Sequence, residues 1–239
     1  GKTNNKILIV VQDKNAAALT DILKDEKQDI TKAVDKKKNT ALHYSLKKGE
    51  IKMIDTILEK APDFINAQND KGETALHIVS YEGKIDIVKR LLAKDADVSK
   101  KDKEGNTPLH LAVYKNHFDI VKLLLEKDES LLKDKNKEDW TPFHNAVLKK
   151  ENEEMLKFLL EKDIDINDPI EGGRTAMDFT AKKLKPLLIE KGGKTKKELE
   201  KENKVGGVNK TKRKRRRKRN WKKRTRKKKR MRLKKKRKH

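Results

Sequence analysis

Apolar residues recur along the first two hundred positions at spacings of three and four, in pairs of short segments separated by polar turns. The second segment of a pair ends in an apolar run, as in IVKRLLAK from Ile87 and IVKLLLEK from Ile120. This period predicts two amphipathic helices per pair. One such pair cannot bury its own apolar faces, so neighbouring pairs must stack. The pattern therefore predicts an all-α solenoid.

A tetrapeptide marks the start of each predicted pair. It reads TALH at Thr40 and Thr74, TPLH at Thr107, TPFH at Thr141 and, altered, TAMD at Thr175, with spacings of 34, 33, 34 and 34 residues. In motif and period, segments such as DKGETALHIVSYEGKIDIVKRLLAKDADV resemble ankyrin repeats. The resemblance covers roughly residues 6–193. It implies helix-turn-helix units with hairpin loops, called fingers, between them.

The resemblance also implies where the chain turns. Thr begins the first helix, with Pro108 and Pro142 in its first turn, where a missing N–H costs little. The turn between the two helices would be left-handed at Gly49, Gly83 and Asn116. The fourth repeat departs from this pattern, because it reads KKENEE and has no glycine.

Two further glycine positions of the family are occupied by aspartate. KDADV and KDIDI stand where ankyrin repeats usually have Gly-Ala-Asp-Val. We therefore expect Asp95 and Asp163 to adopt the conformation that glycine takes there.

The pattern predicts five parts of the chain. Residues 1–34 form an N-terminal capping repeat without the tetrapeptide, and residues 35–170 form four ankyrin repeats. Residues 171–193 form a truncated C-terminal capping repeat. Residues 194–209, a charged helix-capable stretch ending in Gly-Gly, are expected to be a linker. Residues 210–239 form a polybasic tail.

Charge separates the tail from the rest of the chain. The chain has 64 Lys or Arg and 38 Asp or Glu, giving a net charge of +26. The tail holds 23 of the bases and none of the acids, which leaves 64 − 23 = 41 bases against 38 acids elsewhere, or +3. Such asymmetry is typical of a nearly neutral domain that carries an arm for an anionic partner.

Several functions are disfavoured by composition. The absence of cysteine excludes disulfides, thiolate metal sites and a cysteine nucleophile. The apolar run ILIVV, from Ile7 to Val11, is far shorter than the roughly 20 residues of a membrane span. No phosphate loop or Ser/His/Asp grouping is present. We expect no enzyme activity, no cofactor, no small-molecule substrate and no membrane association.

Four histidines lie in the tetrapeptides, one per repeat. Stacked repeats place them about 10 Å apart, which is too far for one metal ion. The resemblance implies a structural role, in which each ring bridges repeats by hydrogen bonds. The residues concerned are His43, His77, His110 and His144.

Ankyrin arrays bind partner proteins with their fingers and inner helices, so the resemblance implies a binding surface here. The fingertip positions of this surface are the residues directly before each Thr. One of them is a tryptophan, which we expect to be exposed, and tryptophan is enriched at interface hot spots. The alternative is that this tryptophan only covers its neighbour's hairpin. The candidates are Asn39, Glu73, Asn106, Trp140 and Arg174 on the fingers, and Lys47, Tyr81, Tyr114 and Leu148 on the inner helices.

The tail favours RNA as its partner. Like charges repel and little in the tail is apolar, so order must come from a polyanion. Lys and Arg neutralise phosphates, and guanidinium and indole rings stack on exposed bases. The candidate RNA-binding residues are Lys212, Arg213, Lys214, Arg215, Arg216, Arg217, Lys218, Arg219, Trp221, Lys222, Lys223, Arg224, Arg226, Lys227, Arg230, Arg232 and Arg237.

Two other interpretations of the tail stay open. KRKRRRKR also fits a nuclear or nucleolar import signal. An anionic membrane surface suits the charge, but the tail lacks the apolar face of an interfacial helix.

Two resemblances of the tail favour the ribosome. The segment RRRKRNWKKRTRKKKRMRLKKKR is similar to the C-terminal basic segment of the Aurora-kinase-interacting type of mitochondrial small-subunit protein, although the His-Lys-Tyr core of that segment is missing. WKKRTRKKKRMRLKKKRK also resembles the tiny Lys/Arg peptide of the eukaryotic large subunit. We therefore expect a ribosomal component, preferably mitochondrial, with rRNA on the tail and protein on the repeats. The alternative is a nuclear or nucleolar ankyrin adaptor.

Overall fold

The structure is a computed structural model, and it describes residues 2–12, 16–23, 29–148 and 152–204. The chain divides into two compact units, Gly1–Gly193 and Lys194–His239. Within the described residues the first unit has helices and no strand. The elements are α1 (Lys2–Gln12), α2 (Ala16–Leu23), η1 (Ile30–Lys32), α3 (Ala41–Lys48), α4 (Ile51–Lys60), η2 (Pro62–Asn66), α5 (Ala75–Glu82), α6 (Ile85–Ala93), α7 (Pro108–Lys115), α8 (Phe118–Lys127), η3 (Glu129–Lys133), α9 (Pro142–Ala146), α10 (Glu153–Leu160), η4 (Glu171–Gly173), α11 (Ala176–Phe179) and α12 (Lys185–Glu190).

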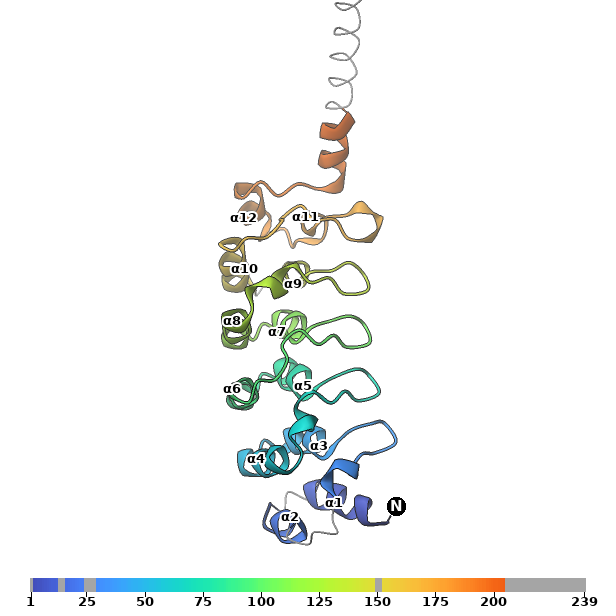
Figure 1. Ribbon diagram of the computed structural model, residues 1–239. Coiled ribbons are helices and arrows are strands. Elements are labelled where there is room, and N and C mark those ends of the chain that lie inside the picture. The colour runs from blue at the N-terminus through green and yellow to red at the C-terminus, as the bar shows by residue number, and fades with distance from the viewer. Residues whose placement is uncertain (1, 13–15, 24–28, 149–151, 205–239) are drawn as a thin grey trace, which may run out of the picture. The chain divides into compact units, whose positions relative to one another are not determined.

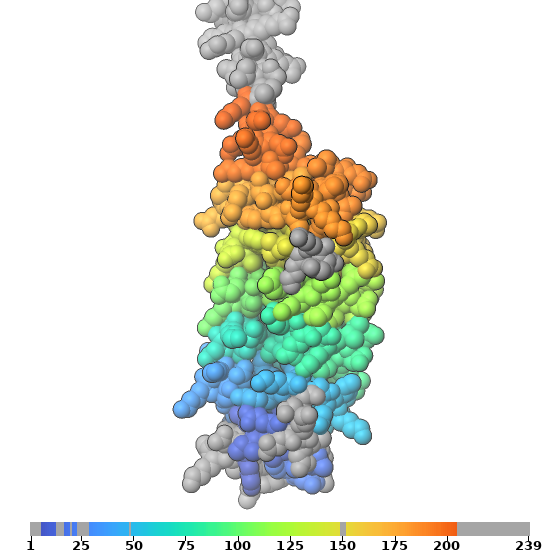
Figure 2. All heavy atoms as spheres, turned by 180° about the vertical axis from the view of Figure 1, so that it is seen from behind, coloured from blue at the N-terminus to red at the C-terminus, as the bar shows by residue number. Residues whose placement is uncertain are grey.

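The first unit is the predicted solenoid of stacked helix pairs. Figure 1 shows inner helices α3, α5, α7, α9 and α11 in one column, with the fingers on one side and outer helices α4, α6, α8, α10 and α12 on the other. Seen from behind in Figure 2, the repeats form successive bands in chain order. The all-α ankyrin fold is therefore as the sequence predicts.

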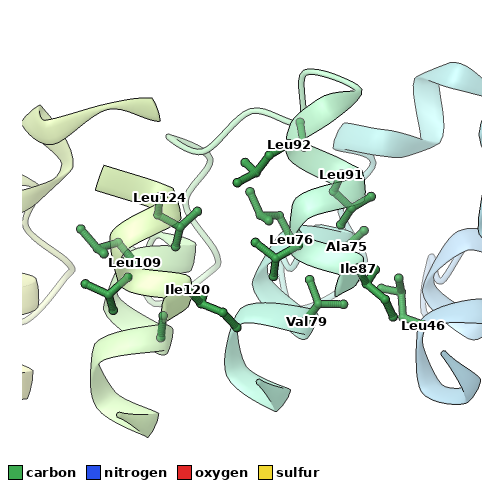
Figure 3. Close-up of a cluster of buried hydrophobic side chains, with 14 of the residues drawn as sticks. Leu46, Ala75, Leu76, Val79, Ile87, Leu91, Leu92, Leu109, Ile120 and Leu124 are labelled. Carbon is green, nitrogen blue, oxygen red and sulfur yellow. The ribbon is translucent and has the colours of Figure 1, made fainter. Parts of the chain in front are cut away.

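Buried aliphatic side chains fill the space between neighbouring pairs. Figure 3 shows Leu76 and Leu91 of one pair beside Leu109, Ile120 and Leu124 of the next. These five are at most 2% exposed. Burying one such side chain contributes about 1.5–3 kcal/mol, so the interface between repeats supplies stability that one pair lacks.

Backbone hydrogen bonds join successive fingers. The amide of Lys103 donates to the carbonyl of Lys71 at 2.8 Å, and the amide of Lys137 donates to that of Glu104 at 2.9 Å. The close approach explains the glycine in the second finger. Gly72 has φ +76°, and a Cβ there would stand 2.7 Å from the nitrogen of Lys103. The fingers therefore stack at main-chain distance.

The inner turns follow the prediction in three repeats. Gly49, Gly83 and Asn116 have φ of 73°, 78° and 62°, so the left-handed turns are confirmed. Residues 149–151 of the fourth turn lie outside the described residues.

The two aspartates at family glycine positions behave differently. Asp95 has φ 58°, as predicted, and the next amide bonds back to the carbonyl of Leu91. The prediction for Asp163 is wrong, because its φ is not positive. After α10 the amide of Ile164 bonds instead to the carbonyl of Lys162 at 2.9 Å. A three-residue turn around Asp163 thus ends this helix without a left-handed residue.

The first unit ends in shorter elements. Residues 171–193 contain the four-residue α11 and the six-residue α12, with Pro186 in the first turn of α12. In the second unit, residues 196–204 are helical, in the charged stretch that the sequence marks as helix-capable. Thr195 and Glu198 cap this helix, since the Thr195 amide donates to the Glu198 carboxylate at 2.8 Å and the Glu198 amide to the Thr195 hydroxyl at 3.3 Å.

Two inner-helix serines provide a test of the core. Both are fully buried, but the Ser80 hydroxyl has no hydrogen-bond partner among the described residues, whereas Ser45 donates to the carbonyl of Leu42 at 2.7 Å. A buried unsatisfied hydroxyl costs about 1–3 kcal/mol. We expect Ser80→Ala to raise the free energy of unfolding by about 1 kcal/mol and Ser45→Ala to lower it by about the same amount. Denaturant midpoints measure both; equal losses for the two variants would contradict the assignment.

Candidate protein-interaction surface

A threonine and a histidine cap each inner helix of the four full repeats. In the third repeat the Thr107 amide donates to Nδ1 of His110 at 3.2 Å, and the Thr107 hydroxyl lies 2.9 Å from the same nitrogen. The His110 amide is 3.5 Å from the threonine oxygen. Histidine thus takes the position that Glu or Gln occupies in an ordinary capping box.

The far nitrogen of each ring reaches the next finger. Because Nδ1 accepts from the threonine amide, Nε2 carries the proton and donates to a backbone carbonyl. These bonds tie the inner helices α3, α5, α7 and α9 to the following repeat. The pairs are His43 to Glu73 at 3.1 Å, His77 to Asn106 at 3.0 Å, His110 to Trp140 at 2.9 Å and His144 to Asp168 at 3.0 Å.

Burial keeps these imidazoles neutral. It lowers the pKa of all four rings, and the hydrogen bond to the next finger offsets the effect only in part. For His110, which is fully buried, the pKa falls from 6.5 to about 4. No group of three or more His, Cys, Asp or Glu side chains in the described part of the chain is placed to hold a metal ion.

One column on the inner helices carries exposed apolar side chains. Tyr81, Tyr114 and Leu148 are 43%, 40% and 39% exposed, and Lys47 continues the column towards the N-terminus. We call these four residues the inner column. The Nζ of Lys115 lies 4.2 Å from the ring centre of Tyr81 and 5.9 Å from that of Tyr114. The column therefore presents two aromatic rings with the ammonium group of Lys115 near both of them.

Trp140 is less exposed than predicted from the sequence. Its ring packs on Phe179 of the next repeat, with centroids 5.4 Å apart, and is only partly exposed. The guanidinium of Arg174 lies 4.6 Å from the centre of the Phe179 ring. Trp140 thus covers its neighbouring repeat, which is the alternative use considered for it. Asn106 also points into the structure, because its Oδ1 accepts from Asn136 at 2.9 Å.

A groove of about 780 Å³ lies over the first two repeats, between their fingers and inner helices. Tyr44, Ile78 and Tyr81 supply its apolar lining. Tyr44 and Ile78 are not among the residues predicted from the sequence. They lie one helical turn before Lys47 and Tyr81, so extending the inner column by three residues would have found them.

The predicted RNA-binding residues, from Lys212 to Arg237, lie outside the described residues. Within the described ranges, no helix has both the length and the apolar character needed to cross a membrane.

Comparison with known proteins agrees with the fold. The family model for ankyrin repeats (3 copies) matches residues 7–102, 55–134 and 76–170. The chain therefore belongs to the ankyrin-repeat family, whose arrays are protein-interaction modules and typically lack enzyme activity. It is similar to the crystal structure of EF0377, an ankyrin repeat protein, with 26% identity, a TM-score of 0.65, and coverage of 72% of this chain and 88% of that one. Comparison with curated proteins finds no match.

The histidine bridges predict acid sensitivity. An imidazole whose pKa is lower in the folded than in the unfolded state stabilises the fold above the unfolded pKa, and this stability is lost as the pH falls. For His110 this stability is lost as the pH falls from 6.5, the ordinary pKa, to about 4, the pKa in the folded protein. We expect unfolding at about pH 5 to require roughly 2 kcal/mol less than at pH 7.5 from this residue alone. Denaturant titrations at both pH values measure this, and an unchanged midpoint would contradict it.

Proposed function

We propose that the inner column is the contact surface through which this protein recognises a partner protein. The observation that supports this proposal is the alignment of Tyr81, Tyr114 and Leu148. Each is exposed at the corresponding position of a successive repeat, with Tyr81 on α5, Tyr114 on α7 and Leu148 in the turn after α9. Aromatic anchors of this kind supply much of the energy of an interface, and the repeats hold them on a rigid scaffold.

The column can be tested without disturbing the core. We expect Tyr81→Ala combined with Tyr114→Ala to weaken partner binding by about 2 kcal/mol or more. A matched control is Ile51→Ala with Ile189→Ala, because these residues are 40% and 60% exposed and lie outside the column. Quantitative mass spectrometry of cross-linked partners compares the two variants with the wild type.

The proposal requires partners that are lost from the tyrosine variant and retained by the control. Thermal melting of both variants must match the wild type. If the tyrosine variant kept every partner, the inner column would not be the contact surface.

We further propose that the tail binds RNA and that the protein is a ribosomal component. The support is the 23 cations among residues 210–239, with no acid among them. Such a segment releases many counterions from a phosphate backbone, which gives strong binding that weakens steeply with salt. The resemblance of the tail to short basic ribosomal segments favours rRNA, with a mitochondrial ribosome as the preferred location.

Deleting residues 210–239 separates the two proposed roles. We expect the full chain to sediment with one ribosomal subunit in a sucrose gradient at moderate salt, and the truncated chain to stay at the top. Markers of cytosolic and mitochondrial subunits would identify the compartment. The melting temperature of the repeats is expected to stay unchanged, because residues 210–239 offer few apolar side chains to their core.

A different result would favour the alternative function. Recovery of the full chain only at the top of the gradient, together with a nuclear signal on imaging, would contradict the ribosomal proposal. It would instead support a nuclear or nucleolar adaptor, for which KRKRRRKR serves as the import signal. Unfolding of the truncated chain would show that the tail and the repeats are not independent.

A further inference from the structure

The groove over the first two repeats differs from the rest of the concave face. At its inner-helix column position this part has Lys47, where later repeats have Tyr or Leu. The first finger adds Lys36 and Lys37, and the second adds Lys71. All four side chains are exposed. The groove therefore combines an apolar part, formed by Tyr44, Ile78 and Tyr81, with four exposed lysines.

The carboxylates of the groove are mostly engaged within the protein. Asp35 accepts from the Tyr44 hydroxyl at 2.7 Å and from the amides of Lys37 and Asn39, each at 2.7 Å. Burial raises the pKa of Asp35, but the hydrogen bonds from Asn39 and Tyr44 outweigh this and lower it, so the carboxylate stays charged. The hydroxyl end of Tyr44 is thereby fixed in place.

Two more carboxylates have partners. Glu73 accepts from Nδ2 of Asn69 at 3.0 Å, and Glu82 pairs with Lys84 at 2.7 Å. By contrast, the ammonium groups of the four groove lysines make no ion pair within the described part of the chain. Asp70, the fourth acid of the groove, is exposed. The groups with free capacity for a ligand are therefore mainly the four lysines, although the groove holds four acids as well.

We propose that this groove binds an extended peptide segment of the partner, in which a large apolar side chain is flanked by Asp or Glu. The apolar side chain would lie on Tyr44, Ile78 and Tyr81, and the flanking carboxylates would pair with Lys36, Lys37, Lys47 and Lys71. This inference rests on the proposed function, because it names the kind of partner that the concave face recognises.

The spacing of charges favours a peptide over RNA. The carboxylates of Asp35, Asp70, Glu73 and Glu82 remain in the groove and repel a continuous row of phosphates. Isolated carboxylates on a peptide can pair with single lysines while avoiding these acids. The volume of about 780 Å³ also matches a site that encloses a few side chains of a ligand.

The test is selection from a random peptide library displayed on phage, with the full chain as bait. Excess heparin occupies the basic tail, so that acidic peptides are not retained by it. Selected peptides are then synthesised, and their Kd values are measured with heparin present. The groove variant is Lys36→Glu with Lys71→Glu.

A control variant has the same change of net charge elsewhere. Lys52→Glu with Lys89→Glu alters two exposed lysines of the outer helices α4 and α6. We expect selected peptides to contain a large apolar residue beside Asp or Glu. Their affinity should fall about tenfold or more for the groove variant and stay within about twofold for the control. Replacing the acidic residues of the peptide by lysine should restore binding to the groove variant.

Each other outcome has a distinct meaning. Peptides that bind the groove variant as well as the wild type would overturn this inference. If their binding is nevertheless lost in Tyr81→Ala with Tyr114→Ala, the proposed function stands and only the acidic partner is wrong. A fluorescent oligouridylate tests for RNA binding, without heparin and against the same control variant. If the groove variant loses affinity for this oligonucleotide and not for the peptides, the groove is a nucleic-acid site and the peptide proposal fails.

Discussion

The hydrogen bond from each tetrapeptide histidine to the next finger is the interaction on which the rest of the structure depends. The same ring closes the cap of its own helix, as in Thr107 and His110, and fixes the backbone of the following repeat at Trp140. One side chain therefore sets both where a helix begins and how far away its neighbour lies. Burial, which makes the ring neutral, also makes this bond free of competition from water.

A fixed distance between repeats gives the concave face its regularity. Residues 33 or 34 positions apart lie in register, so Tyr81, Tyr114 and Leu148 become neighbours although a whole repeat separates each pair. A change at one column position alters one site without altering the scaffold. Lys47 in place of an aromatic residue then distinguishes the groove from the remainder of the inner column, and an extended ligand would meet the cationic end and the apolar end in a fixed order.

Features that depend on residues within one repeat could be predicted from the sequence. The left-handed turns at Gly49 and Asn116 follow from local backbone preferences, and the helix starts follow from the tetrapeptide. Features that depend on a neighbouring repeat could not. Trp140 is partly covered because Phe179 lies opposite, and nothing in its own repeat signals that contact. Asp163 avoids the left-handed conformation because its helix ends in a tighter turn, which the aspartate alone does not reveal.

The tail and the rest of the chain differ strongly in charge, which suggests that they recognise their ligands in different ways. Residues 210–239 carry 23 cations without an acid, so the tail attracts any polyanion and selects little. The remaining chain has a net charge of only +3, and its groove interleaves acids with bases. Acids and bases that alternate in a groove attract a ligand whose charges match them and repel a ligand with a charge in the wrong place, which produces specificity. On the proposed function, the tail would hold the protein on an RNA particle and so raise the local concentration of a partner there. A modest affinity of the concave face would then be sufficient.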